Sequence, residues 1–232
     1  MLQLERQNDI LRILNERKSA TVKELCALLY ASPATIRRDL AFLEERGLLR
    51  RSFGGATLCE LFPDQIPVSL RAAEHLAEKK HIAAKAARLV HPGDTIFIDA
   101  SSTALYMAPY LRGIQDITVI TNNPHLSIAL AENRIRNFCT GGETLNDSVA
   151  YTGSWAERFV RGIRAQSFFF SARGICDGMI TDSSKGERDV KIAMMECAAQ
   201  SYFLAHSSKL GKTFPYVVTD ISRITAMIDE IE

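Results

Sequence analysis

The sequence predicts an α/β protein of two parts, a small helical head and a larger Rossmann-like domain built on a parallel sheet. In residues 1–57, three helical segments follow one another with clear start signals. Farther along, a short apolar strand, a polar loop and a helix occur twice in succession. Strands that alternate with helices pair in parallel in a doubly wound sheet. We therefore place the head at residues 1–57, a linker at 58–68 and the α/β domain at 69–232.

The composition excludes several classes of protein. The 232 residues are 47% apolar and 24% charged, which is ordinary globular usage and argues against extended disorder. No apolar run reaches the length of a membrane span, and the first residues lack the apolar segment of a secretory signal. The five cysteines are scattered and form no CxxC or Cys/His cluster, so we expect neither a disulfide framework nor a structural zinc site. We expect a cytoplasmic protein with no membrane partner, metal or cofactor.

Charge is divided unevenly along the chain. The 28 Lys and Arg nearly balance the 27 Asp and Glu, which argues against a polycation that coats nucleic acid. The head, however, has 10 basic and 7 acidic residues, a net charge of +3, whereas the remainder has 18 and 20, a net charge of −2. Several arginines fall between residues 37 and 51. The head is therefore the part of the chain that suits a nucleic acid.

The head contains three predicted helices. Residues 4–17 place apolar side chains at the spacing of an amphipathic helix. Thr21-Val-Lys-Glu24 is a capping box that begins a second helix, which ends near residue 30. Ser32-Pro33 supplies an N-cap and a proline at the first helical position, so a third helix begins there and ends before Gly47.

The second and third helices predict a helix-turn-helix. In the third helix Ile36, Leu40 and Leu43 share one buried face, which leaves the polar side chains near its N-terminal end free to enter the major groove. Residues 48–56 then suit a wing whose arginines reach phosphates. The alternative is a generic three-helix bundle with a solvated basic face; the order of the elements favours DNA binding. The candidate DNA contacts are Ser32, Ala34, Thr35, Arg37, Arg38, Arg50, Arg51, Gly54 and Gly55.

Polar loops follow the predicted strands of the α/β domain, where ligands bind in such sheets. After the strand at 95–98, Asp99-Ala-Ser-Ser-Thr103 places three hydroxyls and backbone N–H groups at a helix N-terminus, which suits a phosphate. Ordinary N-capping is the alternative, and it accounts for one or two of the hydroxyls. The Asp99 carboxylate would repel a phosphate, so we assign it to sugar hydroxyls or to ordering the loop. The loop contains no GxGxxG or Walker A pattern, which disfavours dinucleotides and nucleoside triphosphates.

Later strand ends add further candidates. A buried strand at 167–170 leads to Arg173, and the strand at 202–205 leads to His206-Ser-Ser-Lys209. A second capping box, Ser184-Lys-Gly-Glu187, begins a helix that carries Lys191, which either enters the same cleft or forms an ordinary i, i+4 pair with Glu187. The candidate effector contacts are Asp99, Ser101, Ser102, Thr103, Thr121, Asn122, Gly141, Gly142, Arg173, Lys191 and Lys209.

These motifs resemble the DeoR family of bacterial transcriptional regulators. In the head the resemblance rests on Ser32-Pro-Ala-Thr-Ile-Arg-Arg-Asp-Leu40, Leu43-Glu44, Gly47, Arg51 and Gly54-Gly-Ala56. It continues through Glu78-Lys79, Ile82-Ala83, Gly93-Asp94, Asp99, Ser102-Thr103, Val119-Ile-Thr-Asn122, Gly141-Gly142, Gly174-Ile175, Lys191 and Ser207-Ser-Lys209. The resemblance implies a winged helix-turn-helix joined to a sensor domain similar to ribose-5-phosphate isomerases. It further implies a homo-oligomeric repressor of carbohydrate catabolism that binds double-stranded operator DNA and a phosphorylated sugar.

Four positions depart from that pattern. Phe53 stands where the family commonly has His, Arg173 where many members have Asp, and His206 where Asp is common before Ser-Ser-Lys. The Asp-Ala-Ser-Ser-Thr loop replaces a more usual Gly-Thr-Thr type. We therefore expect the effector to differ from that of typical members.

An enzyme is the alternative class, namely a sugar-phosphate isomerase with an accessory DNA-binding module. Isomerisation needs a base beside the carbon that loses its proton. Asp99, Glu143 and Glu187 are candidates, yet the sequence shows no paired acid and base, and Arg173 stands where a carboxylate would be wanted. We therefore expect a regulator, with no catalytic residues.

Overall fold

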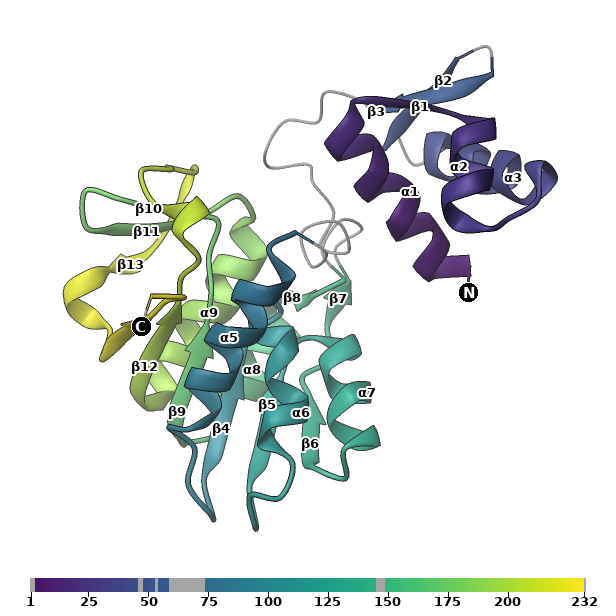
Figure 1. Cartoon of the computed structure of the whole chain (residues 1–232). Coiled ribbons are helices and arrows are strands. Elements are labelled where there is room, and N and C mark those ends of the chain that lie inside the picture. The colour runs from purple at the N-terminus through teal and green to yellow at the C-terminus, as the bar shows by residue number, and fades with distance from the viewer. Residues whose placement is uncertain (1–2, 46–47, 53, 59–73, 145–148, 232) are drawn as a thin grey trace. The chain divides into compact units, whose positions relative to one another are not determined.

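The computed structural model describes residues 3–45, 48–52, 54–58, 74–144 and 149–231. The chain divides into two units, Met1–Glu74 and His75–Glu232, each with its own core (Figure 1). Most of the linker expected at 58–68 lies outside the described residues, as do Gly47 and Phe53. Among the residues that are described, no helix is long and apolar enough to cross a membrane.

The head consists of three helices and a small antiparallel sheet. The helices are α1 (Gln3–Arg17), α2 (Val22–Leu29) and α3 (Pro33–Glu45), and the sheet has the order β1-β3-β2, from β1 (Ser19–Thr21), β2 (Leu49–Ser52) and β3 (Gly55–Leu58). One core joins all three helices to the sheet, with Leu14, Leu25 and Leu40 fully buried. The short strand β1, which the sequence analysis did not predict, pairs with β3 and so ties the wing to the helices.

The predicted helix starts of the head are confirmed. At α2, Glu24 N–H donates to Thr21 Oγ1 over 3.2 Å, and Thr21 N–H donates to Glu24 Oε2 over 2.7 Å, which completes the capping box. At α3, Thr35 N–H donates to Ser32 Oγ over 3.2 Å. These local hydrogen bonds orient both helices at their first turns.

The second unit is built on a six-stranded parallel sheet, as predicted. Its strand order is β14-β12-β9-β4-β5-β6, from β4 (Thr95–Ile98), β5 (Thr118–Thr121), β6 (Arg136–Cys139), β9 (Ala165–Phe170), β12 (Ala198–Leu204) and β14 (Ala226–Ile228). Strand β9 is buried on both faces because Phe169 packs into one apolar cluster whereas Phe168 and Phe170 pack into the other. The aromatic run at 168–170 therefore belongs to the core, in agreement with the buried strand expected there.

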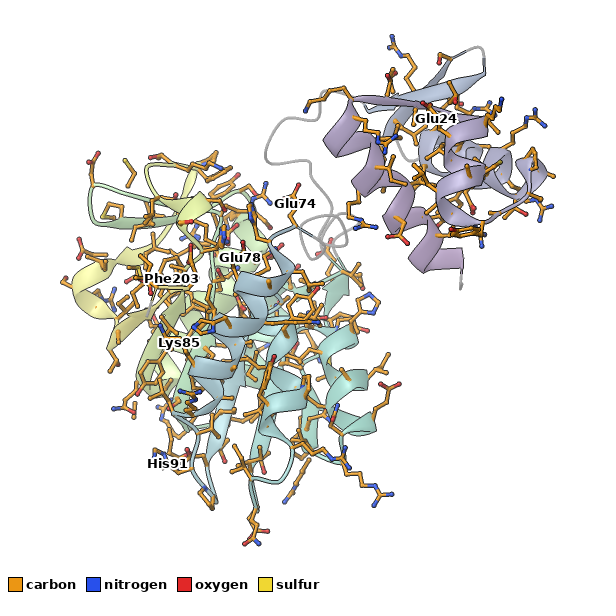
Figure 2. All side chains as sticks on the ribbon, viewed as in Figure 1. Glu24, Glu74, Glu78, Lys85, His91 and Phe203 are labelled. Carbon is orange, nitrogen blue, oxygen red and sulfur yellow. The ribbon has the colours of Figure 1, made fainter. Side chains whose placement is uncertain are left out.

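Helices cover both faces of this sheet (Figure 1). One face carries α5 (Leu76–Ala87), η2 (Ala104–Met107), α6 (Ala108–Leu111) and α7 (Pro124–Glu132), and the other carries α8 (Gly153–Arg161) and α9 (Lys185–Cys197). In the described part of the chain, the first helix of this unit begins at Leu76. Lys85 of α5 donates to the carbonyl oxygens of Asp229 and Ile231 over 3.0 and 2.7 Å, which ties the C-terminal segment to this helix (Figure 2).

Two small antiparallel sheets and two short turns of the described chain lie outside the parallel sheet. They are a three-stranded sheet of β10 (Gly174–Cys176), β11 (Met179–Asp182) and β13 (Tyr216–Asp220), a ladder of β7 (Glu143–Thr144) and β8 (Tyr151–Thr152), and the short turns η3 (Ser207–Lys209) and η4 (Ile221–Arg223). The sequence analysis did not predict these strands, because they lie outside the strand–loop–helix repeats on which it relied. Asp182 ends β11.

Candidate DNA-binding surface and effector site

Helix α3 presents the side chains expected of a recognition helix. Ile36, Leu40 and Leu43 are buried, whereas Ala34, Arg37 and Arg38 are exposed. Thr35 is half-buried, and its hydroxyl lies 2.9 Å from that of Ser32. The exposed arginines therefore stand on the side of the helix that the head does not need for its own core.

A buried carboxylate holds this helix in place. Asp39 is only 2% exposed, and its Oδ2 accepts from Arg6 Nε over 2.5 Å while its Oδ1 accepts from Gln7 Nε2 over 3.1 Å. These bonds join α3 to α1 and satisfy a charge that would otherwise be costly to bury. The sequence analysis missed this role. The available signal was an aspartate three residues after Ile36, on the apolar face of the helix.

The wing is fastened to the recognition helix by Arg51. Its Nε donates to Glu44 Oε2 over 2.5 Å and its backbone N–H donates to Glu44 Oε1 over 2.8 Å. These bonds from Arg51 hold the pKa of the Glu44 carboxyl below its usual value. Arg51 therefore orients the wing, whereas Arg50 is exposed on β2. A phosphate contact by either arginine stays a prediction.

Gly54 and Gly55 of the wing are each required to be glycine, for different structural reasons. Gly54 has φ +93°, a turn conformation that L side chains rarely adopt. At Gly55 a Cβ atom would lie 2.4 Å from the carbonyl oxygen of Ala20, so only glycine allows β3 to approach β1 this closely. Whether either backbone also contacts DNA stays a prediction.

In the second unit, the predicted effector residues of two loops gather at one edge of the parallel sheet. Asp99 follows β4 and Thr121 ends β5, and parallel strands bring their carboxyl ends to the same side. The polar side chains there are buried rather than solvated: Asp99, Ser101, Ser102, Thr103, Thr121 and Asn122 are all at most 8% exposed. Burying so many polar groups needs either internal partners or a ligand.

Asp99 orders its own loop. Its Oδ1 accepts from Ser101 N–H over 3.1 Å, and its Oδ2 accepts from Ser171 N–H over 3.2 Å, at the end of the neighbouring strand β9. Of the two roles considered for Asp99, the structure shows loop ordering. The Ser101 hydroxyl accepts from Ala104 N–H over 3.2 Å, so N-capping accounts for this one hydroxyl, as the alternative interpretation allowed.

Two buried polar atoms in these loops have no protein partner. Thr103 Oγ1 and Asn122 Oδ1 find no hydrogen-bond partner among the described residues, although Thr103 is fully buried. The other end of the Asn122 amide is fixed, because Nδ2 donates to the carbonyl oxygen of Tyr151 over 3.0 Å. Unsatisfied buried polar atoms are rare in proteins and point to a missing ligand or water.

Lys191 lies in a buried cluster of three carboxylates. Its Nζ is 2.8 Å from Asp182 Oδ2, 3.4 Å from Glu187 Oε2 and 3.6 Å from Asp99 Oδ2, and the residue is 3% exposed. Burial alone would lower the pKa of the Lys191 ammonium, but the three carboxylates outweigh it and raise that pKa. Burial raises the pKa of Asp99, against the attraction of Lys191.

This cluster corrects the sequence analysis in two respects. The Ser184 hydroxyl accepts from Glu187 N–H over 3.3 Å as predicted, but the Glu187 carboxylate turns inward to Lys191, so the i, i+4 pair forms inside the domain. The carboxylates are also grouped in space, which the sequence did not reveal. Asp182 was not among the predicted residues, because β11, the strand that it ends, was not predicted.

The remaining candidates follow the strands β6, β9 and β12 of the same sheet, and each has contacts within the domain. Lys209 Nζ donates to the carbonyl oxygen of Ala172, and the Arg173 guanidinium lies 5.4 Å from the centre of the Phe214 ring. Gly142 allows a close approach, because a Cβ atom there would lie 2.5 Å from the carbonyl oxygen of Thr152. Gly141 has φ +63° and faces the Trp155 ring. Effector contacts by these four residues stay predictions.

Comparison with known families agrees with both parts of the chain. Residues 74–230 match the family described as DeoR C terminal sensor domain, and residues 6–61 match the DeoR-like helix-turn-helix domain. The chain belongs to the DeoR family. The resemblance seen in the sequence is thereby confirmed, and this DeoR-family protein is a DNA-binding transcriptional regulator.

Two relatives span nearly the whole chain. The HTH-type transcriptional regulator YulB of Bacillus subtilis (strain 168) is 38% identical over 230 residues, which cover 97% of this chain and 88% of the relative. The lactose phosphotransferase system repressor of Staphylococcus epidermidis (strain ATCC 35984) is 31% identical over 216 residues, which cover 91% and 86%.

Solved structures are more distant. The eIF2B delta structure from Chaetomium thermophilum is 19% identical with a TM-score of 0.53, and the match covers 70% of this chain and 59% of that one. Ribose 5 phosphate isomerase A from Neisseria gonorrhoeae is 17% identical with a TM-score of 0.42, covering 57% and 52%. The first likeness supports the fold of the DeoR sensor domain and nothing about its ligand.

Replacing Lys191 tests the buried cluster. Lys191→Met leaves three carboxylates without their cation, so the free energy of unfolding should fall by about 3–5 kcal/mol at pH 7. The loss should shrink as the pH falls, because protonation of Asp99, whose pKa burial raises, removes buried negative charge. Urea denaturation between pH 7 and 5.5 measures both effects.

The matched control lies on the same helix. Lys185→Met removes an exposed lysine that pairs with Asp189 over 2.7 Å, and it should cost less than about 1 kcal/mol. Equal costs for the two variants would contradict the buried cluster.

Proposed function

We propose that this DeoR-family protein is a cytoplasmic repressor of a carbohydrate-catabolism operon, and that its sensor domain binds a phosphorylated sugar. The observation that carries the proposal is the pair of buried atoms, Thr103 Oγ1 and Asn122 Oδ1, that lack a partner among the described residues. They belong to two neighbouring loops at the ligand-binding edge of the sheet. A ligand with several oxygen atoms would satisfy both.

The charge distribution of the site assigns the phosphate and the sugar hydroxyls of such a ligand to different places. The positive charge of Lys191 is already surrounded by three carboxylates, so that cluster would repel a phosphate. The loop at 101–103 offers hydroxyls and backbone N–H groups, which suit an anion. We therefore place the phosphate at this loop and the sugar hydroxyls towards Asn122 and the carboxylates, with Lys209 and Arg173 as further candidates for the phosphate.

The relatives support the choice of target. The relative from Staphylococcus epidermidis is named a repressor of the lactose phosphotransferase system, and a sugar taken up by phosphorylation reaches the cell interior as a sugar phosphate. By analogy, the operon that this protein controls serves a carbohydrate. This support concerns the class of effector and leaves its identity to experiment.

We propose that effector binding to the sensor domain and operator binding by the head are thermodynamically linked. A single small head makes few base contacts, so specific binding requires at least two heads on one operator. We propose that the sensor domains form a homo-oligomer and that the effector favours one arrangement of the heads over another. An effector can shift operator affinity only by its own difference in affinity for these arrangements.

The buried carboxylates also favour a second candidate, the sugar-phosphate isomerase. A base with a raised pKa is what proton abstraction needs, and Asp99 has one. Both Asp99 oxygens, however, accept backbone N–H groups, which occupies them with holding the loop. We therefore favour the regulator. Turnover of any aldose or ketose phosphate by the purified chain would support the enzyme instead.

Replacing Arg38 tests the recognition helix. Arg38 is exposed near the first turn of α3, so Arg38→Ala should weaken operator binding by about 1–3 kcal/mol, or roughly fivefold to 150-fold. The measurement is fluorescence anisotropy at fixed salt, with a duplex selected in vitro from a random library. Arg12→Ala, which removes an exposed arginine from α1, is the control and should change affinity less than about twofold. Unchanged affinity for Arg38→Ala argues against α3 as the reading helix.

Replacing Thr103 tests the effector site without a folding penalty. Because Thr103 Oγ1 has no partner among the described residues, Thr103→Val should leave the stability of the ligand-free protein within about 1 kcal/mol. It should weaken binding of the effector by about 1–3 kcal/mol, because a charge-assisted hydrogen bond is lost. Thermal-shift titration with a panel of phosphorylated sugars measures both quantities.

A matched variant should behave in the opposite way. The buried Thr219 hydroxyl donates to the carbonyl oxygen of Asp220 over 3.3 Å, so Thr219→Val should lower stability and leave effector affinity unchanged. If Thr103→Val binds every sugar phosphate as tightly as the parent chain does, the proposed site is wrong.

A charge placed in the same loop tests the phosphate end. Ser102→Asp should abolish the response of operator binding to the effector, because its carboxylate repels the phosphate, while operator affinity without effector stays unchanged. Ser222→Asp, at an exposed position in η4, is the control. A normal effector response in Ser102→Asp would place the phosphate elsewhere.

A further inference from the structure

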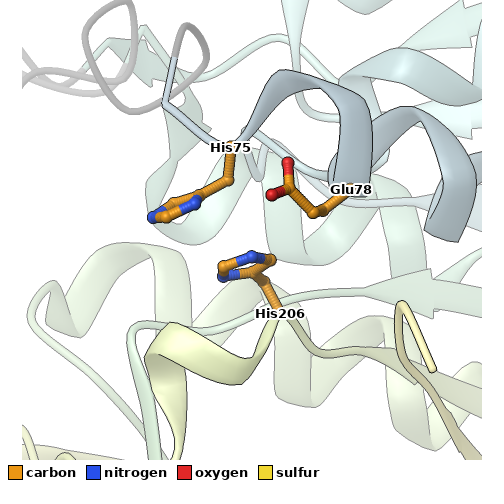
Figure 3. A group of neighbouring side chains, drawn as sticks. All are labelled: His75, Glu78 and His206. Atoms are coloured by element: carbon orange, nitrogen blue, oxygen red, sulfur yellow. The ribbon is translucent and has the colours of Figure 1, made fainter.

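Two histidines and a glutamate meet at the start of the first helix of the sensor domain. His75 is the N-cap residue of α5, Glu78 lies in its first turn, and His206 follows β12 (Figure 3). One ligand atom from each of the three lies within 4.8 Å of the others. We propose that His75, Glu78 and His206 bind a divalent transition-metal ion of the zinc class.

The donor set fits such an ion. Two imidazole nitrogens and one carboxylate oxygen are ligands that Zn²⁺ and its neighbours in the first transition series accept, with room for water at a fourth position. Bonds of about 2.0–2.2 Å require the donors to close in by roughly an ångström from their present separations. His75 is exposed and Glu78 half-buried, so both can move, whereas His206 is 4% exposed and anchors the site.

The η3 turn engages one ring nitrogen of His206. Its Nδ1 lies 2.8 Å from Ser208 Oγ and accepts from Ser208 N–H over 3.1 Å, which leaves Nε2 as the nitrogen that can face an ion. For Nε2 to bind a metal, the ring proton must move to Nδ1, where a hydrogen bond donated to Ser208 Oγ would replace the one that Nδ1 accepts from Ser208 N–H. A hydrogen-bond partner on the second nitrogen is usual for histidines that bind metals.

Negative charge beside the ring of His206 favours a cation there. The groups that face the ring are Glu78, Glu230 and Lys79, and Glu230 Oε1 lies 3.7 Å from Nε2. The two imidazole rings stack with their centroids 4.1 Å apart, so the exposed ring of His75 must turn before nitrogens of both rings can face a shared ion.

The backbone of His75 supports a specific placement of its ring. His75 has φ +53°, a left-handed conformation that is uncommon for a residue with a side chain. This conformation brings its ring over His206, as Figure 3 shows. The sequence analysis expected no metal, because His75 and His206 lie far apart in the chain and only the fold brings them together.

Zinc binding by the full chain tests the site directly. After the protein is stripped with a chelator, Zn²⁺ is titrated in competition with a chromophoric indicator at pH 7.5. The parent chain should bind one Zn²⁺ per chain, and His75→Ala and Glu78→Gln should each weaken binding at least tenfold. His81→Ala, which removes an exposed histidine from the same helix, should bind as the parent does. Co²⁺ in place of Zn²⁺ should give visible absorption bands that His75→Ala loses.

Each other outcome overturns the proposal. If the parent chain binds no Zn²⁺, the histidines form only a stacked pair. If His75→Ala and His81→Ala bind as the parent does, the ion sits elsewhere. Both variants change exposed residues, so thermal melts should match the parent and exclude misfolding. The titration contains neither DNA nor sugar, so its result is independent of the proposed effector.

Discussion

The buried contact of Lys191 with three carboxylates holds together the ligand-binding edge of the sensor domain. Lys191 comes from α9, Asp182 from the end of β11 and Asp99 from the loop after β4, so one ammonium group joins three elements that are distant in the chain. Asp99 extends the network through hydrogen bonds to the backbone at Ser101 and Ser171. Removing a single member would leave a buried charge without compensation, which costs more than the pair itself contributes. The geometry of the neighbouring loops depends on this network.

In the head, too, acidic side chains join separate elements of the fold. Asp39, buried under α3, accepts hydrogen bonds from Arg6 and Gln7 of α1, and Glu44 fastens the wing through Arg51. In both units acidic side chains fix the scaffold. The exposed arginines of α3 and the hydroxyls of the sensor loops are the groups for which we propose contacts with other molecules. The uneven charge of the sequence, positive on the head and negative on the remainder, agrees with this division.

Sequence reasoning predicted the features that depend on neighbouring residues. The capping box at Thr21, the N-cap at Ser32 and the strand–loop–helix repeats are local patterns, and the structure contains each of them. Contacts between distant segments escaped prediction. Asp39 packs against α1, and Asp182 ends a four-residue strand. The inward turn of Glu187 also depends on Lys191 being buried, which no local pattern indicates. Effector contacts by Gly141, Gly142, Arg173 and Lys209, which follow other strands of the same sheet, stay predictions.

Coupling between the two units is the central claim, and reciprocal linkage tests it most directly. Two dissociation constants are measured: that of the best-binding sugar phosphate, with and without saturating operator duplex, and that of the operator, with and without saturating sugar phosphate. Each pair gives the ratio by which one ligand changes the affinity for the other. Thermodynamics requires the two ratios to be equal, and coupled sites typically give a ratio of about 5–150. We predict equal ratios within this range. A sugar phosphate that binds equally well in the presence and absence of operator would contradict the coupling.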